Sequence, residues 1–143
     1  MKRVLVLNGP NLGRLGSREP DVYGSTTHAE LVEQLIERGS ALQLEVDVRQ
    51  TDDEATLIGW LHEAAEESIA VVLNPAAFTH YSYALRDAAA QCTAPLIEVH
   101  LSNPAAREEF RHNSVISGVA NGTIAGFGVG SYLLALQAIA DGV

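Results

Sequence analysis

Apolar segments of strand length recur along this chain, and helical patterns separate each segment from the next. They lie at residues 3–8, 42–50, 69–74 and 95–100, with a weaker one at 122–127. Most are apolar without a break, which is typical of strands in a parallel sheet that is covered on both faces. The segment LQLEVDVRQ, residues 42–50, instead alternates apolar and polar residues, so we expect it at an edge of the sheet.

Helix signals fall in the intervals between these segments. Thr27 opens the capping-box pattern THAE, and Thr51 opens a second, TDDE. We expect Thr79 to cap a third helix running to about residue 92, and Asn103, followed by proline, to open another. Alternating strands and helices require right-handed crossovers. The prediction is one α/β domain over residues 1–143, a flavodoxin-like, doubly wound parallel sheet of five strands in the order 2-1-3-4-5.

The bulk composition excludes several classes of protein. A formal net charge of −9 argues against a nucleic-acid partner, because phosphate backbones are bound by clustered Lys and Arg. The one cysteine, Cys92, provides neither an internal disulfide nor a zinc motif. Residues 113–140 carry no charge and are long enough to cross a bilayer, but glycines interrupt them repeatedly. We therefore expect a cytoplasmic protein that interacts with no membrane.

Polar residues gather at the carboxyl ends of the expected strands. Ligands of doubly wound sheets bind outside these ends, near the point where the strand order reverses. Strand one ends at Asn8, strand three ends at Asn74, and strand four ends in EVHLS, residues 98–102. Arginines lie in the flanking segments, at positions 14, 18, 107 and 111. Because helix N-termini and guanidinium groups both favour anions, we expect a small anionic substrate, a carboxylate in particular.

The motifs of the sequence limit which reactions are possible at this rim of the sheet, formed by the carboxyl ends of the strands. The chain contains no G-x-x-x-x-G-K-[ST], no G-x-G-x-x-G after a strand and no G-x-S-x-G. Its one lysine, Lys2, precedes the first strand, which argues against a Schiff base at the rim. Tyr23, with Arg18 five residues before it, is a candidate base, since a nearby cation favours the phenolate. His100 and Glu98, on the same side of a strand, form a candidate oriented acid or base.

Four motifs together resemble one family of enzymes. They are LNGPNLGRLGSREPDVYG (7–24), LNPAAFTHYSYALRD (73–87), EVHLSN (98–103) and AREEFRHNS (106–114). In order and over nearly the whole chain, they are similar to type II 3-dehydroquinate dehydratase. The resemblance implies conversion of 3-dehydroquinate to 3-dehydroshikimate by anti elimination through an enolate, in the shikimate pathway. It also implies a reaction without cofactor or metal, and a homo-oligomer of trimers assembled into a dodecamer.

The resemblance implies roles for individual residues. Tyr23 would abstract a proton from C2 as a tyrosinate that Arg18 stabilises, and Asn11 would hold a water against the enolate oxygen. His100, oriented by Glu98, would protonate the departing C1 hydroxyl. The residues that would bind the hydroxyls and carboxylate of the substrate are Asn74, His80, Asp87, Leu101, Ser102 and Arg111.

The glycines of the first motif predict a lid. Gly13, Gly16 and Gly24 flank a segment at about residues 13–24 that carries Arg18 and Tyr23. Closure of this segment would complete the catalytic group and exclude water at the same time.

Two positions depart from the family pattern. After the third strand the pattern is close to N-x-G-G-x-T-H-T-S, whereas this chain reads NPAAFTHYS. Pro75, Ala76 and Ala77 therefore stiffen a turn that is usually rich in glycine. Ser131 stands where a glycine commonly precedes the tyrosine of the last helix. The first departure is expected to alter the shape of the pocket.

Alternative interpretations remain on the same fold. A non-enzymatic flavin or nucleotide carrier would co-purify with a chromophore. A response-regulator receiver needs acids at the ends of strands one and three, which here end in Asn8 and Asn74. Arg107 competes with Arg111 for the substrate carboxylate; we favour Arg111 and expect Arg107 to pair with nearby acids on an exposed helix face.

Overall fold

In the computed structural model, which describes residues 1–17 and 19–143, the described chain forms a sheet of five parallel strands. The strands are β1 (Lys2–Asn8), β2 (Leu44–Gln50), β3 (Ala70–Asn74), β4 (Leu96–His100) and β5 (Gly122–Ala125). Their order is β2-β1-β3-β4-β5, and every neighbouring pair is parallel. The predicted order is confirmed, and so is the prediction that residues 42–50 form an edge strand.

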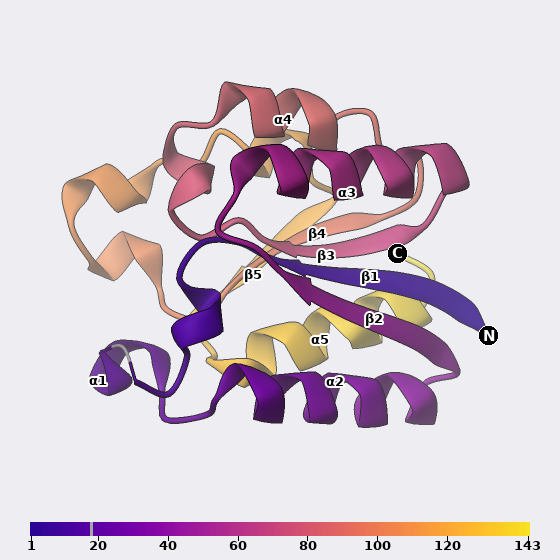
Figure 1. Ribbon diagram of the computed structural model, residues 1–143, viewed down its shortest axis with the longest axis horizontal. Helices are drawn as coiled ribbons and strands as arrows, with labels where there is room; N and C mark the ends of the chain where they lie inside the picture. The colour runs from indigo at the N-terminus through magenta and orange to yellow at the C-terminus, as the bar shows by residue number, and fades with distance from the viewer. Residues whose placement is uncertain (18) are drawn as a thin grey trace.

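Helices cover both faces of this sheet, as Figure 1 shows. The α-helices are α1 (Pro20–Tyr23), α2 (His28–Ala41), α3 (Glu54–Glu67), α4 (Tyr83–Ala89) and α5 (Val129–Ala140). α3 and α4 lie on one face, and α2 and α5 lie on the other (Figure 1). Short 3₁₀ helices occur in the connections: η1 (Leu12–Arg14), η2 (Ala76–His80), η3 (Pro104–Ala106), η4 (Glu109–His112) and η5 (Ser117–Val119).

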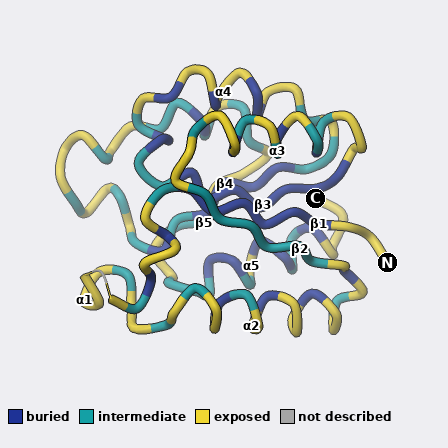
Figure 2. The backbone as a smooth tube through the Cα atoms, viewed as in Figure 1, coloured by how far each residue is buried: buried dark blue, intermediate teal, exposed yellow. Residues whose placement is uncertain are grey.

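The two faces of β1 belong to separate apolar cores. Val4 and Val6 pack in the cluster that contains residues of α2 and α5, and Leu5 and Leu7 pack in the cluster that contains residues of α3 and α4. All four side chains are fully buried, and β3, which pairs with this part of β1, is buried over its whole length and dark blue in Figure 2. Burial on both sides is the reason why the strand segments are apolar without a break.

The capping box predicted at Thr27 is confirmed, but the one predicted at Thr51 is wrong. Thr27 Oγ1 accepts the Glu30 N–H at 3.1 Å, and the Glu30 carboxylate accepts the Thr27 N–H at 3.2 Å. α3 is instead capped by Asp53, whose carboxylate accepts the Thr56 N–H at 3.1 Å. Thr51 supports that cap from outside the helix, since its Oγ1 accepts the Asp53 N–H at 3.0 Å.

The expected helix from Thr79 is also wrong, because Thr79 lies inside η2 and its side chain is buried. α4 is capped by Ser82, whose Oγ accepts the Leu85 N–H at 3.0 Å, and it ends at Ala89. Asn103 does cap a helix, as expected, with Oδ1 accepting the Ala105 N–H at 3.2 Å. That helix is only the 3₁₀ turn η3, so the segment expected to be one helix is divided between η3 and η4.

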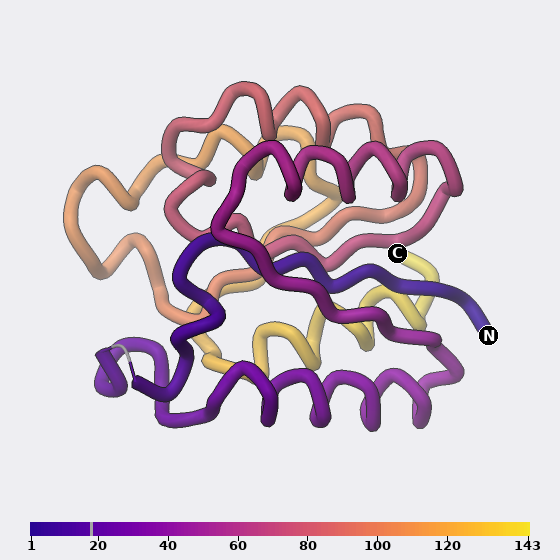
Figure 3. Tube along the Cα trace, in the orientation of Figure 1, coloured from indigo at the N-terminus to yellow at the C-terminus, as the bar shows by residue number. Residues whose placement is uncertain are grey.

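The carboxyl ends of the strands lie at one end of the sheet. In Figure 3 the indigo segment after β1 and the orange segments after β4 approach each other there, at the left of the view. The uncharged residues 113–140 include β5 and the whole of α5, which is a helix of 12 residues. Among the described residues, none of the helices has the length and apolar character that crossing a membrane would require.

Candidate active site

A pocket lies at the carboxyl ends of β1, β3 and β4. Its lining comprises Pro10, Asn11, Leu12, Tyr23, Asn74, Ala76, Ala77, His80, His100, Leu101, Ser102, Pro104, Arg107 and Arg111. Most residues expected at the site are therefore brought together from four separate parts of the chain. Glu98 lies behind His100 and does not line the pocket. Arg18 lies outside the described residues.

His100 is oriented by a buried carboxylate. Nε2 of His100 lies 2.6 Å from Oε2 of Glu98, and the Glu98 side chain is 0% exposed. Both residues lie on β4 with their side chains on the same side of the strand, as their spacing predicts. A bond of this length between a ring nitrogen and a carboxylate fixes the ring position before any substrate arrives.

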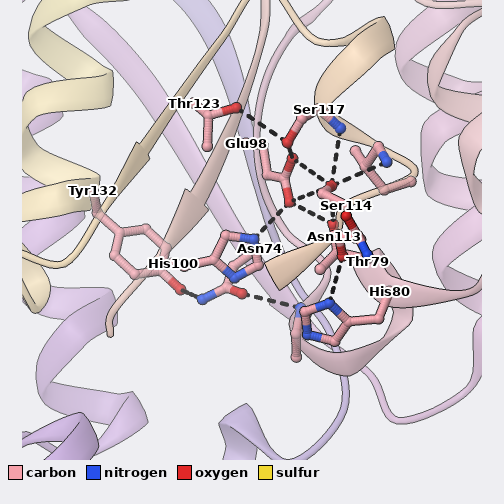
Figure 4. A network of polar contacts seen from close by, with 12 residues as sticks. Asn74, Thr79, His80, Glu98, His100, Asn113, Ser114, Ser117, Thr123 and Tyr132 are labelled. Carbon is pink, nitrogen blue, oxygen red and sulfur yellow. Dashed lines mark hydrogen bonds and ion pairs between the residues drawn. The ribbon is translucent and has the colours of Figure 1, made fainter. Parts of the chain in front are cut away.

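Hydroxyl groups complete the hydrogen bonding of the Glu98 carboxylate (Figure 4). Thr79 Oγ1 donates to Oε2 at 2.5 Å, Ser117 Oγ donates to Oε1 at 2.6 Å, and Ser114 Oγ donates to Oε1 at 3.1 Å. Burial by itself raises the pKa of Glu98, but the bonds from His100, Ser117 and Thr79 outweigh it and hold the pKa below its usual range. The carboxylate is therefore charged at neutral pH and can stabilise positive charge on the His100 ring.

The sequence does not reveal these three hydroxyl donors. Its local pattern predicts Thr79 as a helix cap and gives Ser114 and Ser117 no role at the site. The donors lie 16 to 19 residues away from Glu98 along the chain. No local pattern marks them, because isolated serines and threonines are common in loops.

Arg107 is another residue whose position the sequence did not reveal. Its guanidinium carbon lies 5.0 Å from the centroid of the Tyr23 ring, and its Nη1 donates to Ser102 Oγ at 3.2 Å. The Arg107 side chain is only 14% exposed and lines the pocket, so the expectation of an exposed helix face is wrong. The expected acidic partner is present, at 3.9 Å, as Glu108.

Arg111 also lines the pocket, as expected. Its Nε donates to Glu108 Oε1 at 3.1 Å, and its guanidinium lies 4.6 Å from the centroid of the Phe110 ring. His80 packs its ring edge-to-face with Phe110 at 5.8 Å, and its Nδ1 lies 2.8 Å from the Asn113 carbonyl oxygen. At this wall of the pocket the His80 ring and the Arg111 guanidinium, which can meet an anion, both contact Phe110, a residue outside the lining.

The turn after β1 places Asn11 in the pocket through a left-handed backbone. Asn11 has φ 70°, and its N–H donates to Asp52 Oδ1 at 2.8 Å. Gln50 braces the same turn, with Nε2 donating to Asp52 at 3.1 Å and to the Gly9 carbonyl at 3.1 Å. A Cβ on Gly9 would lie 2.8 Å from the Pro75 carbonyl oxygen, so only glycine permits this close approach of the two loops.

The turn after β3 carries the alanines that replace glycine. Ala76 has φ 51°, which is left-handed backbone that glycine adopts without cost. A non-glycine residue in this region costs about 1–2 kcal/mol. The Ala76 N–H donates to Asn74 Oδ1 at 3.1 Å, so the buried Asn74 amide holds the turn.

Asp87 is the one residue expected to bind substrate, among those the structure describes, that does not line the pocket. It lies on α4 with its side chain 71% exposed, and its Oδ1 accepts from Arg86 Nη1 at 2.8 Å. Over residues 1–17 and 19–143, groups of three or more His, Cys, Asp and Glu side chains suited to holding a metal ion are not found.

Comparisons with known proteins agree on one family. Residues 2–140 match the family described as dehydroquinase class II. A 3-dehydroquinate dehydratase of Salinispora tropica is 64% identical over 138 residues, which cover 96% of this chain and 96% of the relative. The crystal structure of the type II dehydroquinase from Propionibacterium acnes superposes with a TM-score of 0.98 at 58% identity, covering 99% of this chain and 97% of that one. The type II dehydroquinase structure from Butyrivibrio crossotus gives 0.94 at 42% identity, with 96% and 97% covered.

Proposed function

This chain belongs to the class II dehydroquinases and catalyses the dehydration of 3-dehydroquinate to 3-dehydroshikimate in the shikimate pathway, and we propose from this premise how its residues perform the reaction. The observation that supports the proposal is that Tyr23 and His100 line the same pocket. One can serve as the base and the other as the acid of an elimination. A flavin or nucleotide carrier is not favoured, because every relative named above is a dehydroquinase or 3-dehydroquinate dehydratase.

Tyr23 acts as the base in this proposal. Its phenolate takes the proton from C2 of 3-dehydroquinate, and the electron pair of the broken C–H bond forms the enolate. The Arg107 guanidinium over the ring is positioned to stabilise negative charge on the reacting tyrosinate. Arg18, which lies outside the described residues, is proposed to act in the same direction.

His100 acts as the acid. Its Nε2 is engaged with Glu98, which leaves Nδ1 to deliver a proton to the C1 hydroxyl. The enolate then collapses, the C1–O bond breaks, and the hydroxyl leaves as water. Because Glu98 is charged and buried, it stabilises the imidazolium that must be present before this step.

The remaining lining residues hold the substrate. Asn11 is proposed to hold a water against the enolate oxygen. The proposed ligands of the hydroxyls and carboxylate in the pocket are Asn74, His80, Leu101, Ser102 and Arg111. Residues of the segment at about 13–24 are proposed to close over this substrate, with Gly16 at φ 90° and Gly24 at φ 85° at its turns.

Asp87 is proposed to contact substrate in the pocket of another subunit, since it is exposed and lies outside the pocket of its own chain. Tyr81 and Tyr83, near it in sequence, are 59% and 69% exposed. Exposed aromatic residues of this kind are enriched in subunit interfaces. We therefore retain the proposal of a cytoplasmic homo-oligomer of trimers assembled into a dodecamer, which light scattering of the purified protein would test.

The activity is tested by mixing the purified protein with 3-dehydroquinate and recording the ultraviolet absorbance of the conjugated enone product. Absorbance should rise without added metal. Treatment with borohydride in the presence of substrate should leave the activity intact, since the one lysine of the sequence, Lys2, lies at the start of β1, far from the carboxyl ends of the strands. A flat trace from folded protein would contradict the function.

A further inference from the structure

We propose that Tyr132 is a positioning residue for this reaction, acting on the substrate through the side-chain amide of Asn74 and the pocket turn at Ala76. The inference rests on the proposed function, because Asn74 serves in it as a substrate ligand. It concerns a residue of α5 that does not line the pocket.

The Tyr132 hydroxyl belongs to a buried chain of hydrogen bonds. The side chain is 0% exposed, yet its hydroxyl donates to Asn8 Oδ1 at 2.7 Å and accepts from Asn74 Nδ2 at 2.8 Å. Asn74 Oδ1 in turn accepts the Ala76 N–H at 3.1 Å. Figure 4 shows the ring of Tyr132 directed with its hydroxyl toward the amide of Asn74. The chain thus runs from α5, through the ends of β1 and β3, to the lining of the pocket.

The direction of these bonds fixes the orientation of the amide. A phenol has one hydrogen, and here Asn8 Oδ1 accepts it, so Asn74 must present its NH₂ group to the phenol oxygen. Its carbonyl oxygen then faces the Ala76 N–H. A flipped Asn74 would bring its NH₂ against that N–H, which leaves buried donors without an acceptor. The second N–H of Asn74 Nδ2 remains available for a substrate oxygen.

At the other end of this series of hydrogen bonds, the donors and acceptors of Asn8 and His28 are also fixed. Asn8 Nδ2 lies 3.1 Å from His28 Nε2, and with Oδ1 occupied by Tyr132 the Asn8 NH₂ must donate there. His28 Nε2 must therefore be an acceptor, as in the neutral ring. Burial lowers the pKa of His28, which favours this neutral form, and burial raises the pKa of Tyr132, which keeps its hydroxyl protonated.

The pocket turn depends on this arrangement. Ala76 is held at φ 51°, where a residue with a Cβ is strained, and Asn74 is the side chain that bonds its N–H. Removing the phenol hydroxyl frees Asn74 to rotate and to release the turn. Substrate contact is then lost at Asn74, whereas the reacting groups Tyr23 and His100 keep their own partners.

The test compares Tyr132→Phe with Ser131→Ala in steady-state kinetics on 3-dehydroquinate. Ser131 is the adjacent residue of the same helix and equally buried, but its Oγ accepts the Phe127 N–H at 3.1 Å, outside the pocket. We expect Tyr132→Phe to raise KM about fivefold while kcat stays within about twofold of the wild-type value. The reason is that the variant loses one hydrogen bond to a group that binds substrate. Ser131→Ala should lower the melting temperature while leaving KM unchanged.

A further variant tests the route through Asn74. When Asn74→Ala is already present, adding Tyr132→Phe should leave KM where Asn74→Ala put it, because residues that act through one group are not additive. If Tyr132→Phe fails to fold, Asn8→Ala removes the acceptor of the phenol hydrogen, and it too should raise KM.

Equal KM values in wild type, Tyr132→Phe and Asn8→Ala, with reduced melting temperature alone, would overturn the inference. An independent, additive effect of Tyr132→Phe on KM in the Asn74→Ala background would overturn it as well. Wild-type protein without turnover refutes the proposed function itself, and that result is obtained before any variant is compared.

Discussion

The two groups proposed to move protons are held in contrasting ways. His100 stands on a strand against a fully buried carboxylate that also receives hydroxyl bonds from neighbouring loops. Tyr23 ends α1, a four-residue helix without any buried residue, between Glu19 at φ 40° and Gly24 at φ 85°. His100 is therefore oriented by the core before substrate binds, whereas Tyr23 belongs to a segment on the outside of the sheet that we propose closes over the substrate. This contrast predicts which substitutions change only the catalytic rate and which also change the stability of the fold.

The largest effect is expected for Tyr23→Phe. Removal of the phenol hydroxyl should lower kcat about 10³-fold, within the range for loss of a positioned base. The melting temperature should change by less than about 2 °C, since Tyr23 is outside the fully buried core. Enone absorbance and circular dichroism melting measure the two quantities, and a near-normal kcat would show that Tyr23 is not the base.

Glu98→Gln should affect both quantities. An amide cannot accept from all of the donors around it, so we expect kcat to fall about 10²-fold and the fold to lose about 3 kcal/mol. Unlike Tyr23→Phe, this variant should melt several degrees below wild type at pH 7. A variant with full stability would mean that the buried network does not depend on the charge.

The stability of Glu98→Gln relative to wild type should depend on pH. Because the folded protein holds the pKa of Glu98 below its usual value of 4.5, the charged carboxylate stabilises the fold above that value, and the stabilisation is lost as the pH falls through the folded pKa. The difference in melting temperature between wild type and Glu98→Gln should therefore be greatest near neutral pH and shrink below about pH 4.5. A constant difference across this range would contradict the assignment of a charged Glu98.

Ser117→Ala is expected to have an intermediate effect. It removes the 2.6 Å bond to Glu98 Oε1 and leaves Ser114 on the same oxygen at 3.1 Å. We expect about 1–2 kcal/mol of lost stability and a kcat about fivefold lower, since His100 then faces a less constrained carboxylate. Thr123→Ala is the control, because Thr123 touches the network only through Ser117, at 3.4 Å. Equal kinetics for the two variants would place Ser117 outside the orienting network.

Gly24→Ala should have the smallest effect on the fold. Gly24 has φ 85° and ψ 173°, a conformation nearly restricted to glycine, and a Cβ there would meet no other atom within 4 Å. The strain is therefore local to the segment, and we expect kcat and KM to change together by about twofold to threefold with the melting temperature nearly unchanged. Gly59→Ala, in the exposed part of α3, is the matched control and should leave kinetics unchanged. A large loss of global stability in Gly24→Ala would contradict the distinction between the two regions.

The strand order, the edge position of β2, the capping box at Thr27 and most of the residues that line the pocket could be predicted from the sequence. These predictions rest on hydrophobic periodicity, on local capping patterns and on the rule that ligands bind at the carboxyl ends of parallel strands. All three signals are contained within short segments or follow from the topology alone. The family motifs added the reaction and the expected roles of the residues.

The hydrogen-bond partner of each short polar side chain, by contrast, follows from the folded structure and not from the sequence. Thr79 caps no helix because its hydroxyl meets the carboxylate of Glu98, 19 residues away. Tyr132 meets Asn8 across 124 residues. A serine, threonine or aspartate can satisfy its hydrogen bonds locally or across the fold, and the choice depends on distances that exist only after the sheet has formed.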